Sequence, residues 1–282
     1  MAYETYVAVA DQTQARELAA TESPFTIEVR FLGGLNTRQK AAFTAAADRW
    51  VTAIVGDLPP VRIGDDVIDD VLIEAQGRPI DGPGKILGQA GPTHVRPEGS
   101  GASALLPAKG VMTFDTDDLK KMQSEGTLND VITHEMGHVL GIGTIWPLKK
   151  LLKGEGTDNP TFSGKAAMAA YKTLRGAGRA VRVPVENIGG PGTAGGHWRE
   201  TVFRNELMSG FIAAPGNPMS AVTVGSLQDL GYTVDTSAAE PFTLPDLLSL
   251  AEEGRLVAPR DPFADGVVLT NLPVVLPRES LV

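Results

Sequence analysis

The residues with the clearest chemical meaning are His134 and His138, which enclose a glutamate in the motif His134-Glu-Met-Gly-His138. Residues four positions apart lie on the same face of a helix, so both imidazoles can reach one metal ion. Glu135 follows the first histidine directly, where it can accept a proton from an attacking water without binding the metal itself. The motif therefore predicts a hydrolytic zinc centre. The alternative interpretation is a surface helix with two solvated histidines.

Two histidines do not complete such a centre, because catalytic zinc generally takes three protein ligands and keeps its fourth position open. The chain has no cysteine and four histidines, which leaves His94 and His197 as the remaining imidazoles. Gly141 follows the second ligand by three residues, as in metzincins with short spacing, where the third histidine comes three residues after the glycine. Here that position is Thr144, so the usual third ligand is missing from its usual place.

A long insertion between the glycine and the third histidine is a feature of the leishmanolysin-like peptidases, and several motifs of this chain resemble theirs. The stretch Gly195-Gly-His-Trp-Arg-Glu200, followed by Asn205-Glu-Leu-Met-Ser-Gly210, is similar to their third-ligand segment and Met-turn. The resemblance covers about residues 25 to 238. Further matching motifs are Ile80-Asp-Gly-Pro-Gly84, Leu87-Gly-Gln-Ala-Gly91, Met112-Thr-Phe-Asp115 and Leu227-Gln-Asp-Leu-Gly-Tyr232.

This resemblance implies that His197 is the third ligand, that Met208 lies beneath the metal, and that the chain is a zinc endopeptidase with one Zn²⁺. The residues agree, because the two glycines before His197 let the backbone approach the helix closely. Two rival functions stay open: a zinc-bearing binding module without turnover, against which the intact Glu135 argues, and a zinc amidase acting on a non-peptide substrate.

Other polar residues give weaker signals. His94 stands in a polar stretch and is interpreted as a surface histidine rather than a ligand. Glu200 either braces the site through a hydrogen bond or faces solvent. An acidic cluster either holds calcium or forms a solvated turn, and we favour the turn; its members are Asp65, Asp66, Asp69 and Asp70.

The chemical residues need a framework that positions them. The predicted helices and strands, together with the family resemblance, indicate an α+β, metzincin-like zincin fold. It consists of a small twisted, mostly parallel sheet with one antiparallel edge strand, an active-site helix and an irregular C-terminal subdomain. Alternation and turn residues predict strands at 25–31, 69–75, 86–90 and 111–115. Helices are predicted from Asn36 or Thr37 to 54, from Thr127 as N-cap to Leu140, and over 164–174 and 222–230.

The predicted organisation has five parts. The long segment before His197 carries repeated apolar residues, so we expect it to pack as an ordered unit rather than form a slack linker. The parts are an N-terminal arm (1–24, loosely attached or a short helix), an N-terminal catalytic subdomain (25–143), an insertion (144–196), a C-terminal subdomain with the third ligand and Met-turn (197–238) and an extended proline-rich tail (239–282).

Composition restricts the partners. The net charge of −9 without a compensating Lys/Arg cluster argues against nucleic acid, and no apolar run is long enough to span a membrane. We expect a protein or peptide substrate that binds in extended form along the 86–90 edge strand. The family resemblance favours secretion, yet Met1 to Ala20 shows no signal peptide, so the location stays open. Without cysteine, a thiolate latency switch is impossible; the 1–24 arm could at most block the cleft sterically or through Asp11.

Overall fold

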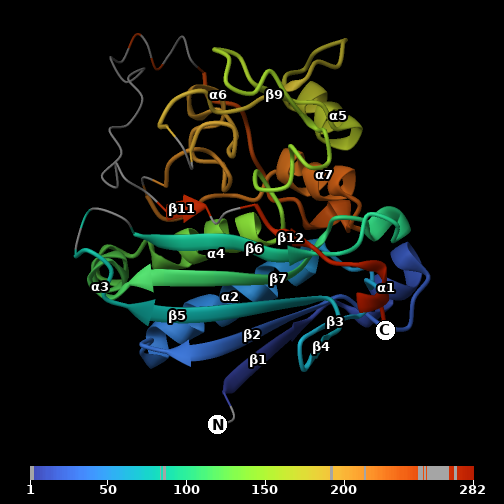
Figure 1. The fold of residues 1–282 in the computed structure, drawn as a ribbon. Coiled ribbons are helices and arrows are strands. Elements are labelled where there is room, and N and C mark those ends of the chain that lie inside the picture. Colours follow the sequence, from blue (N-terminus) through green and yellow to red (C-terminus); the bar gives the residue numbers. More distant parts are fainter. Residues whose placement is uncertain are drawn as a thin grey trace.

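A seven-stranded mixed sheet forms the base of the molecule (Figure 1). The computed structural model describes residues 3–82, 84, 87–190, 193–212, 214–246, 250, 252, 267–269 and 272–282. The main path of the sheet has the order β1-β2-β5-β7-β6-β11, and β12 pairs with β6 beside β11. The strands are β1 (Glu4–Val9), β2 (Thr26–Gly33), β5 (Val71–Arg78), β6 (Gly88–Val95), β7 (Pro107–Asp115), β11 (Val267–Leu269) and β12 (Val274–Val275).

The sheet is mostly parallel, as predicted. The pairs β2–β5, β5–β7, β6–β11 and β6–β12 are parallel, whereas β1–β2 and β6–β7 are antiparallel. The four predicted strands all exist as β2, β5, β6 and β7. The prediction that the N-terminal arm is loosely attached is wrong, because Glu4–Val9 pairs with β2 along its whole length. The expected short helix is α1 (Gln12–Ala19), which Asp11 caps by accepting hydrogen bonds from the Thr13 and Gln14 amides.

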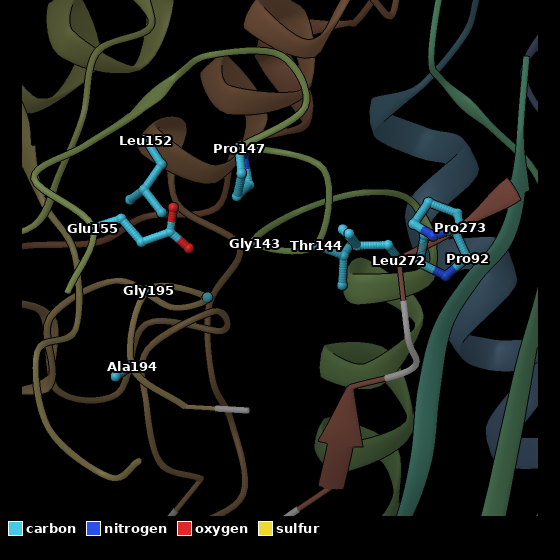
Figure 2. A pocket seen from close by; sticks show the side chains of 11 residues that line it. Pro92, Gly143, Thr144, Pro147, Leu152, Glu155, Ala194, Gly195, Leu272 and Pro273 are labelled. Atoms are coloured by element: carbon cyan, nitrogen blue, oxygen red, sulfur yellow. The ribbon is translucent and has the colours of Figure 1, made fainter. Parts of the chain in front are cut away.

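The predicted edge position of residues 86–90 is also wrong. Residue 86 lies outside the described residues, and β6 is antiparallel to β7 as expected, but β11 and β12 pair with its other side. Leu276 follows β12 and anchors this segment, because its side chain is buried beside Val61, Leu72 and Ala108. Figure 2 shows Leu272 and Pro273, just before β12, next to Pro92 of β6. The C-terminal segment therefore takes the place that the sequence assigned to a substrate.

Two long helices pack against one face of the sheet: α2 (Thr37–Ala53) and α4 (Leu128–Val139) (Figure 1). Asn36 caps α2 with a complete capping box, as its position predicts. Thr127 stands at the N-cap position of α4, but its side chain makes no capping hydrogen bond, contrary to the prediction. An additional helix, α3 (Thr116–Glu125), follows the N-cap residue Asp115 and was not predicted.

The elements between Trp146 and Leu230 lie above α4 as small irregular units (Figure 1). Its aromatic core joins Trp146, Phe162 and Trp198, whose ring centroids lie 4.8–5.5 Å apart. Phe162 and Trp146 belong to the 144–196 segment, so that segment contributes side chains to the main core. The elements are β8 (Leu152–Lys153), β9 (Thr161–Phe162), β10 (Val183–Pro184), α5 (Lys165–Leu174), α6 (Glu200–Phe203) and α7 (Ala221–Leu230).

The smaller elements complete the chain. A hairpin of β3 and β4 was not predicted, and the described residues also include three short 3₁₀ helices. In the described part of the chain, every helix is too short or too polar to cross a membrane. The bounds are β3 (Val61–Ile63), β4 (Asp66–Ile68), and the 3₁₀ helices Gly101–Ser103, Thr236–Ala238 and Arg278–Ser280.

Candidate metal centre

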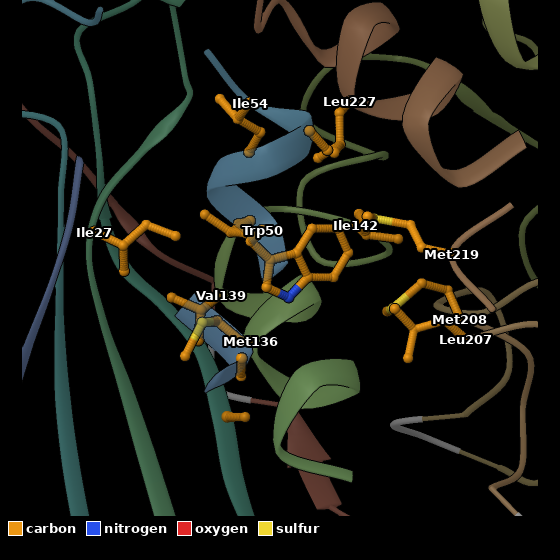
Figure 3. Close-up of a cluster of buried hydrophobic side chains, with 14 of the residues drawn as sticks. Ile27, Trp50, Ile54, Met136, Val139, Ile142, Leu207, Met208, Met219 and Leu227 are labelled. Carbon is orange, nitrogen blue, oxygen red and sulfur yellow. The ribbon is translucent and has the colours of Figure 1, made fainter. Parts of the chain in front are cut away.

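The first two predicted ligands lie on the buried helix α4. His134 and His138 are one helical turn apart and only 5% and 1% exposed. Trp50 of α2 holds the helical turn before His134, because its indole Nε1 donates a hydrogen bond to the Thr133 carbonyl at 2.9 Å. Gly137 between the two histidines leaves room for the Met208 side chain, since an added Cβ would lie 2.7 Å from Met208 Sδ. Figure 3 shows Trp50 near Val139 and Met136, and Met208 beside Leu207 and Met219.

The third predicted ligand, His197, comes from a loop instead of a helix. Gly143, just after α4, has φ +77° and lies against Gly196, so closely that a Cβ on Gly143 would be 2.1 Å from the Gly196 carbonyl oxygen. Gly195 has φ +83°, a conformation that favours glycine. These glycines allow the loop to pass directly over the end of the helix and bring His197 to the two helical imidazoles.

The three histidines converge through the same ring atom. All three Nε2–Nε2 distances are 3.0 Å. Each Nδ1 in turn faces a backbone carbonyl: Leu207 for His134 at 2.6 Å, Ile142 for His138 at 2.8 Å, and Thr193 for His197 at 2.9 Å. A carbonyl oxygen only accepts, so each Nδ1 carries the proton and each Nε2 presents a lone pair.

This arrangement fits a metal ion. Three lone pairs that face one another cannot hydrogen-bond among themselves, and a cation between them removes the mismatch. Burial is the main cause that lowers the pKa of all three histidines, that of His134 to about 3, so the rings are neutral as metal ligands must be. Nitrogen donors 3.0 Å apart can share one ion at the usual Zn–N distance of about 2.0–2.1 Å.

Glu135 is buried beside the first histidine. Its side chain is 6% exposed, and its Oε2 has no hydrogen-bond partner among the described residues. Burial raises the pKa of Glu135 to about 8. A nearby metal cation would lower this pKa again, because an opposite charge favours the carboxylate. A buried carboxyl group with a free oxygen is able to exchange a proton with a bound molecule.

The remaining candidates do not join the three histidines. His94 is half-buried on β6, and its Nδ1 lies 3.0 Å from Thr93 Oγ1. Glu200 is 2% exposed, so the solvent-facing alternative is wrong; burial raises its pKa to about 7, although a hydrogen bond with Ser209 lowers it. Its backbone amide donates to Glu186 Oε2 at 2.8 Å.

The acidic cluster separates into different roles. Asp66 pairs with Arg30 at 3.0 Å, whereas Asp70 is buried and accepts hydrogen bonds from Thr26 and Leu58. Oxygens of Asp69 and Asp70 come close to one of Asp57, a residue that the sequence did not suggest. Exposed carboxylates often gather in this way without an ion, and nothing else at this position indicates calcium.

A small cavity of about 150 Å³ opens beside the metal centre (Figure 2). Gly196 and Gly143 lie in its wall, next to His197 and to the Ile142 carbonyl that holds His138. Thr144, the residue at the usual third-ligand position, also lines it and donates to the His138 carbonyl at 2.7 Å. The other lining residues are Pro92, Pro147, Leu152, Glu155, Ala194, Gly195, Leu272 and Pro273.

Comparison with known proteins now adds an independent observation. The profile of the leishmanolysin peptidase family matches residues 85–249, which is more than half of the chain and includes all three histidines and Glu135. The chain belongs to the leishmanolysin family. Leishmanolysin of Leishmania donovani is 27% identical over 209 residues, which cover 68% of this chain and 34% of that protein. Leishmanolysin of Leishmania major is 30% identical over 142 residues, or 48% of this chain and 23% of its own length.

The aligned region covers only part of each leishmanolysin. Leishmanolysin of Leishmania chagasi is 28% identical over 210 residues, and here too the aligned part is 33% of that protein. The chain thus spans about a third or less of the curated relatives that it matches. Family membership accounts for the order of the motifs around the histidines, and the activity of this chain needs its own argument.

Proposed function

We propose that this chain is a zinc-dependent endopeptidase in which His134, His138 and His197 hold one zinc ion. The observation that carries the proposal is the convergence of three Nε2 lone pairs at 3.0 Å, each fixed by an Nδ1–carbonyl hydrogen bond. Membership of a zinc metallopeptidase family supports the choice of metal and of reaction. When bound, zinc supplies Lewis acidity, which polarises a carbonyl group and lowers the pKa of water.

Glu135 is the general base in this proposal. It takes the proton of the attacking water and passes it to the leaving amine, which needs a carboxylate close to the metal that is not itself a ligand. The free, buried Oε2 of Glu135 fits that role. Its seclusion from bulk water also keeps the transferred proton within the site.

For the substrate we propose a protein or peptide, as the family suggests, and we propose that it binds in extended form along β6. Along β6 such a strand would need the positions that β11 and β12 take in this structure. A substrate that pairs with β6 must therefore displace residues 267–269 and 272–275. This competition is part of the proposed binding mode.

The first experiment is digestion of casein or gelatin with and without a chelator. We expect cleavage that stops with the chelator and returns with Zn²⁺. A silent binding module would bind zinc without cleaving, and a zinc amidase would leave both proteins intact while hydrolysing small amides. Glu135→Gln should keep zinc and lose about a hundredfold or more in turnover; normal turnover of this variant would contradict the assigned base.

A further inference from the structure

Glu206 is a charged residue that lies completely inside the molecule, with 0% exposure. It belongs to the turn that carries Met208, and four donors surround its carboxylate. Oε2 accepts from the Met208 amide at 2.6 Å. Oε1 accepts from the Ser220 amide at 3.0 Å, the Ser220 hydroxyl at 2.7 Å and the Thr223 hydroxyl at 2.5 Å. The carboxylate thus joins the turn to the N-terminus of α7.

One end of this network leads to the first histidine. Glu206 holds the Met208 amide, which belongs to the same planar peptide group as the Leu207 carbonyl. That carbonyl receives the His134 Nδ1–H at 2.6 Å. The Leu207 amide donates to the Pro218 carbonyl at 2.9 Å, so the peptide groups on both sides of Leu207 are fixed. The direction of the Leu207 carbonyl, and with it the orientation of the His134 ring, depends on the turn that Glu206 holds.

The other end leads to the third histidine. Thr223 Oγ1 donates to Glu206 and accepts from Trp198 Nε1 at 2.8 Å. The Trp198 amide donates to the Met208 carbonyl at 2.9 Å. Trp198 is the neighbour of His197, so its indole and its backbone anchor the loop that brings His197 to α4.

We propose that Glu206 is a positioning residue that aligns His134 and His197 from behind. The inference rests on the proposed metal site and adds a residue to it that touches neither the metal nor the substrate. Groups that orient metal ligands typically change metal affinity or activity by about 10–100-fold when they are lost.

The chemistry of the network makes Glu206→Gln a sharp test. A glutamine has the same shape but replaces one acceptor oxygen with an NH₂ group. In one orientation that group faces the Met208 amide, and in the other it faces the Ser220 amide. Hydroxyl groups can rotate to accept, but backbone N–H groups cannot, so either orientation leaves two donors facing each other. The turn must shift to relieve this contact.

A matched control is available in the sheet half of the molecule. Asp70 is 1% exposed, and its two oxygens accept from the Leu58 amide at 2.7 Å and from the Thr26 amide at 2.7 Å. Asp70→Asn therefore creates the same kind of mismatch between buried donors. Neither Leu58 nor Thr26 contacts one of the three histidines. The Asp70→Asn variant therefore reports how much stability is lost when a buried carboxylate is replaced with an amide, without an effect on the metal site.

The experiment measures zinc affinity by competition with a chromophoric chelator, the visible spectrum of the Co²⁺-substituted protein, and the urea midpoint of the metal-free protein. We expect Glu206→Gln to weaken zinc binding by about 10–100-fold and to change the Co²⁺ spectrum. Asp70→Asn should lower the urea midpoint but leave zinc affinity and spectrum unchanged.

A second variant covers the case in which Glu206→Gln does not fold. Thr223→Val keeps the carboxylate and the shape of the side chain but cuts the link to Trp198, and we expect a smaller loss of zinc affinity. Wild-type zinc affinity and spectrum in both folded variants would overturn the inference; with only Thr223→Val folded, its unchanged affinity would do the same. Failure of the wild-type protein to bind zinc would instead overturn the proposed function.

Discussion

The helix that carries His134 and His138 and the loop that carries His197 bring their ligands to the same point by different physical means. On α4 the spacing of the residues and the helical turn set the two imidazoles, and Trp50 locks the turn from the core. His197 has no regular element to hold it. Its loop is bracketed by Glu186, whose amide donates to the His197 carbonyl and whose carbonyl accepts from Gly195, both at 2.9 Å.

The difference shows where the centre is vulnerable. A helix buried on several sides keeps its side chains in place whether or not a metal is bound. A loop held by single hydrogen bonds and close glycine contacts gains much of its order from the ligand that it helps to bind. We therefore expect the helical half of the site to persist without metal and the loop half to depend on it.

The largest effect should come from removing the loop ligand. His197→Ala leaves two imidazoles, fewer than the three protein ligands that catalytic zinc usually takes, so zinc should be lost on dialysis. The helix content measured by circular dichroism should stay unchanged, because α4 is packed independently of His197. Full zinc retention in this variant would show that the third ligand lies elsewhere, with His94 as the next candidate.

Metal removal should separate the two regions directly. Hydrogen exchange of the chelator-treated protein should speed up by at least about tenfold at amides of residues 186–190 and 193–209, since three unshielded Nε2 lone pairs then face one another. Amides of α4 should keep their protection. Equal acceleration in both regions would mean that the helix and the loop form one cooperative unit, and the comparison would fail.

A smaller effect should come from the contact that joins the loop to the helix end. Gly143→Ala places a Cβ 2.1 Å from the Gly196 carbonyl oxygen, so the backbone must move next to His197. The control is Gly156→Ala, which has a similar φ of +74° but no atom within 4 Å. The control should cost about 1–2 kcal/mol in urea unfolding, the penalty for a left-handed residue. Gly143→Ala should cost more and also weaken zinc binding; equal costs would show that the contact is unimportant.

The smallest expected effect concerns the sheet, where β11 and β12 cover the outer side of β6. His94 and Val274 are Cα partners between β6 and β12, and the sequence contains no cysteine. The pair His94→Cys and Val274→Cys can therefore form a single disulfide that keeps the segment on β6. If substrate competes for β6, oxidation should slow protein cleavage several-fold, and a reductant should restore it. Equal rates in both states would place the substrate elsewhere.

The sequence predicted the parts of this molecule that depend on local pattern. Asn36 and the alternation of residues 25–31 suffice to place α2 and β2, and the motif at His134 places two ligands on a helix. The position of His197 required the family resemblance, because no local spacing connects it to α4 across the 144–196 segment.

The rest depends on contacts between distant segments. Residues 88–90 resemble an edge strand in the sequence because their partners, residues 267–269, follow about 180 residues later in a proline-rich stretch. The sequence does not predict helix α3 because the helix lacks a clear apolar face. Leu119 and Met122 are its only buried apolar residues, and the rest of its surface is strongly polar. Glu206 lies in the Asn205-to-Gly210 motif, but the sequence indicates no role for it, and only the fold places four donors around its carboxylate.

The most direct test of the account is anomalous diffraction at the zinc edge from crystals of the zinc-loaded protein. The account predicts one peak per chain within about 2.0–2.1 Å of the Nε2 atoms of His134, His138 and His197. Glu135 should lie nearby without coordinating the ion. A zinc ion bound by only two of these histidines, or located instead at Asp57, Asp69 and Asp70, would contradict it.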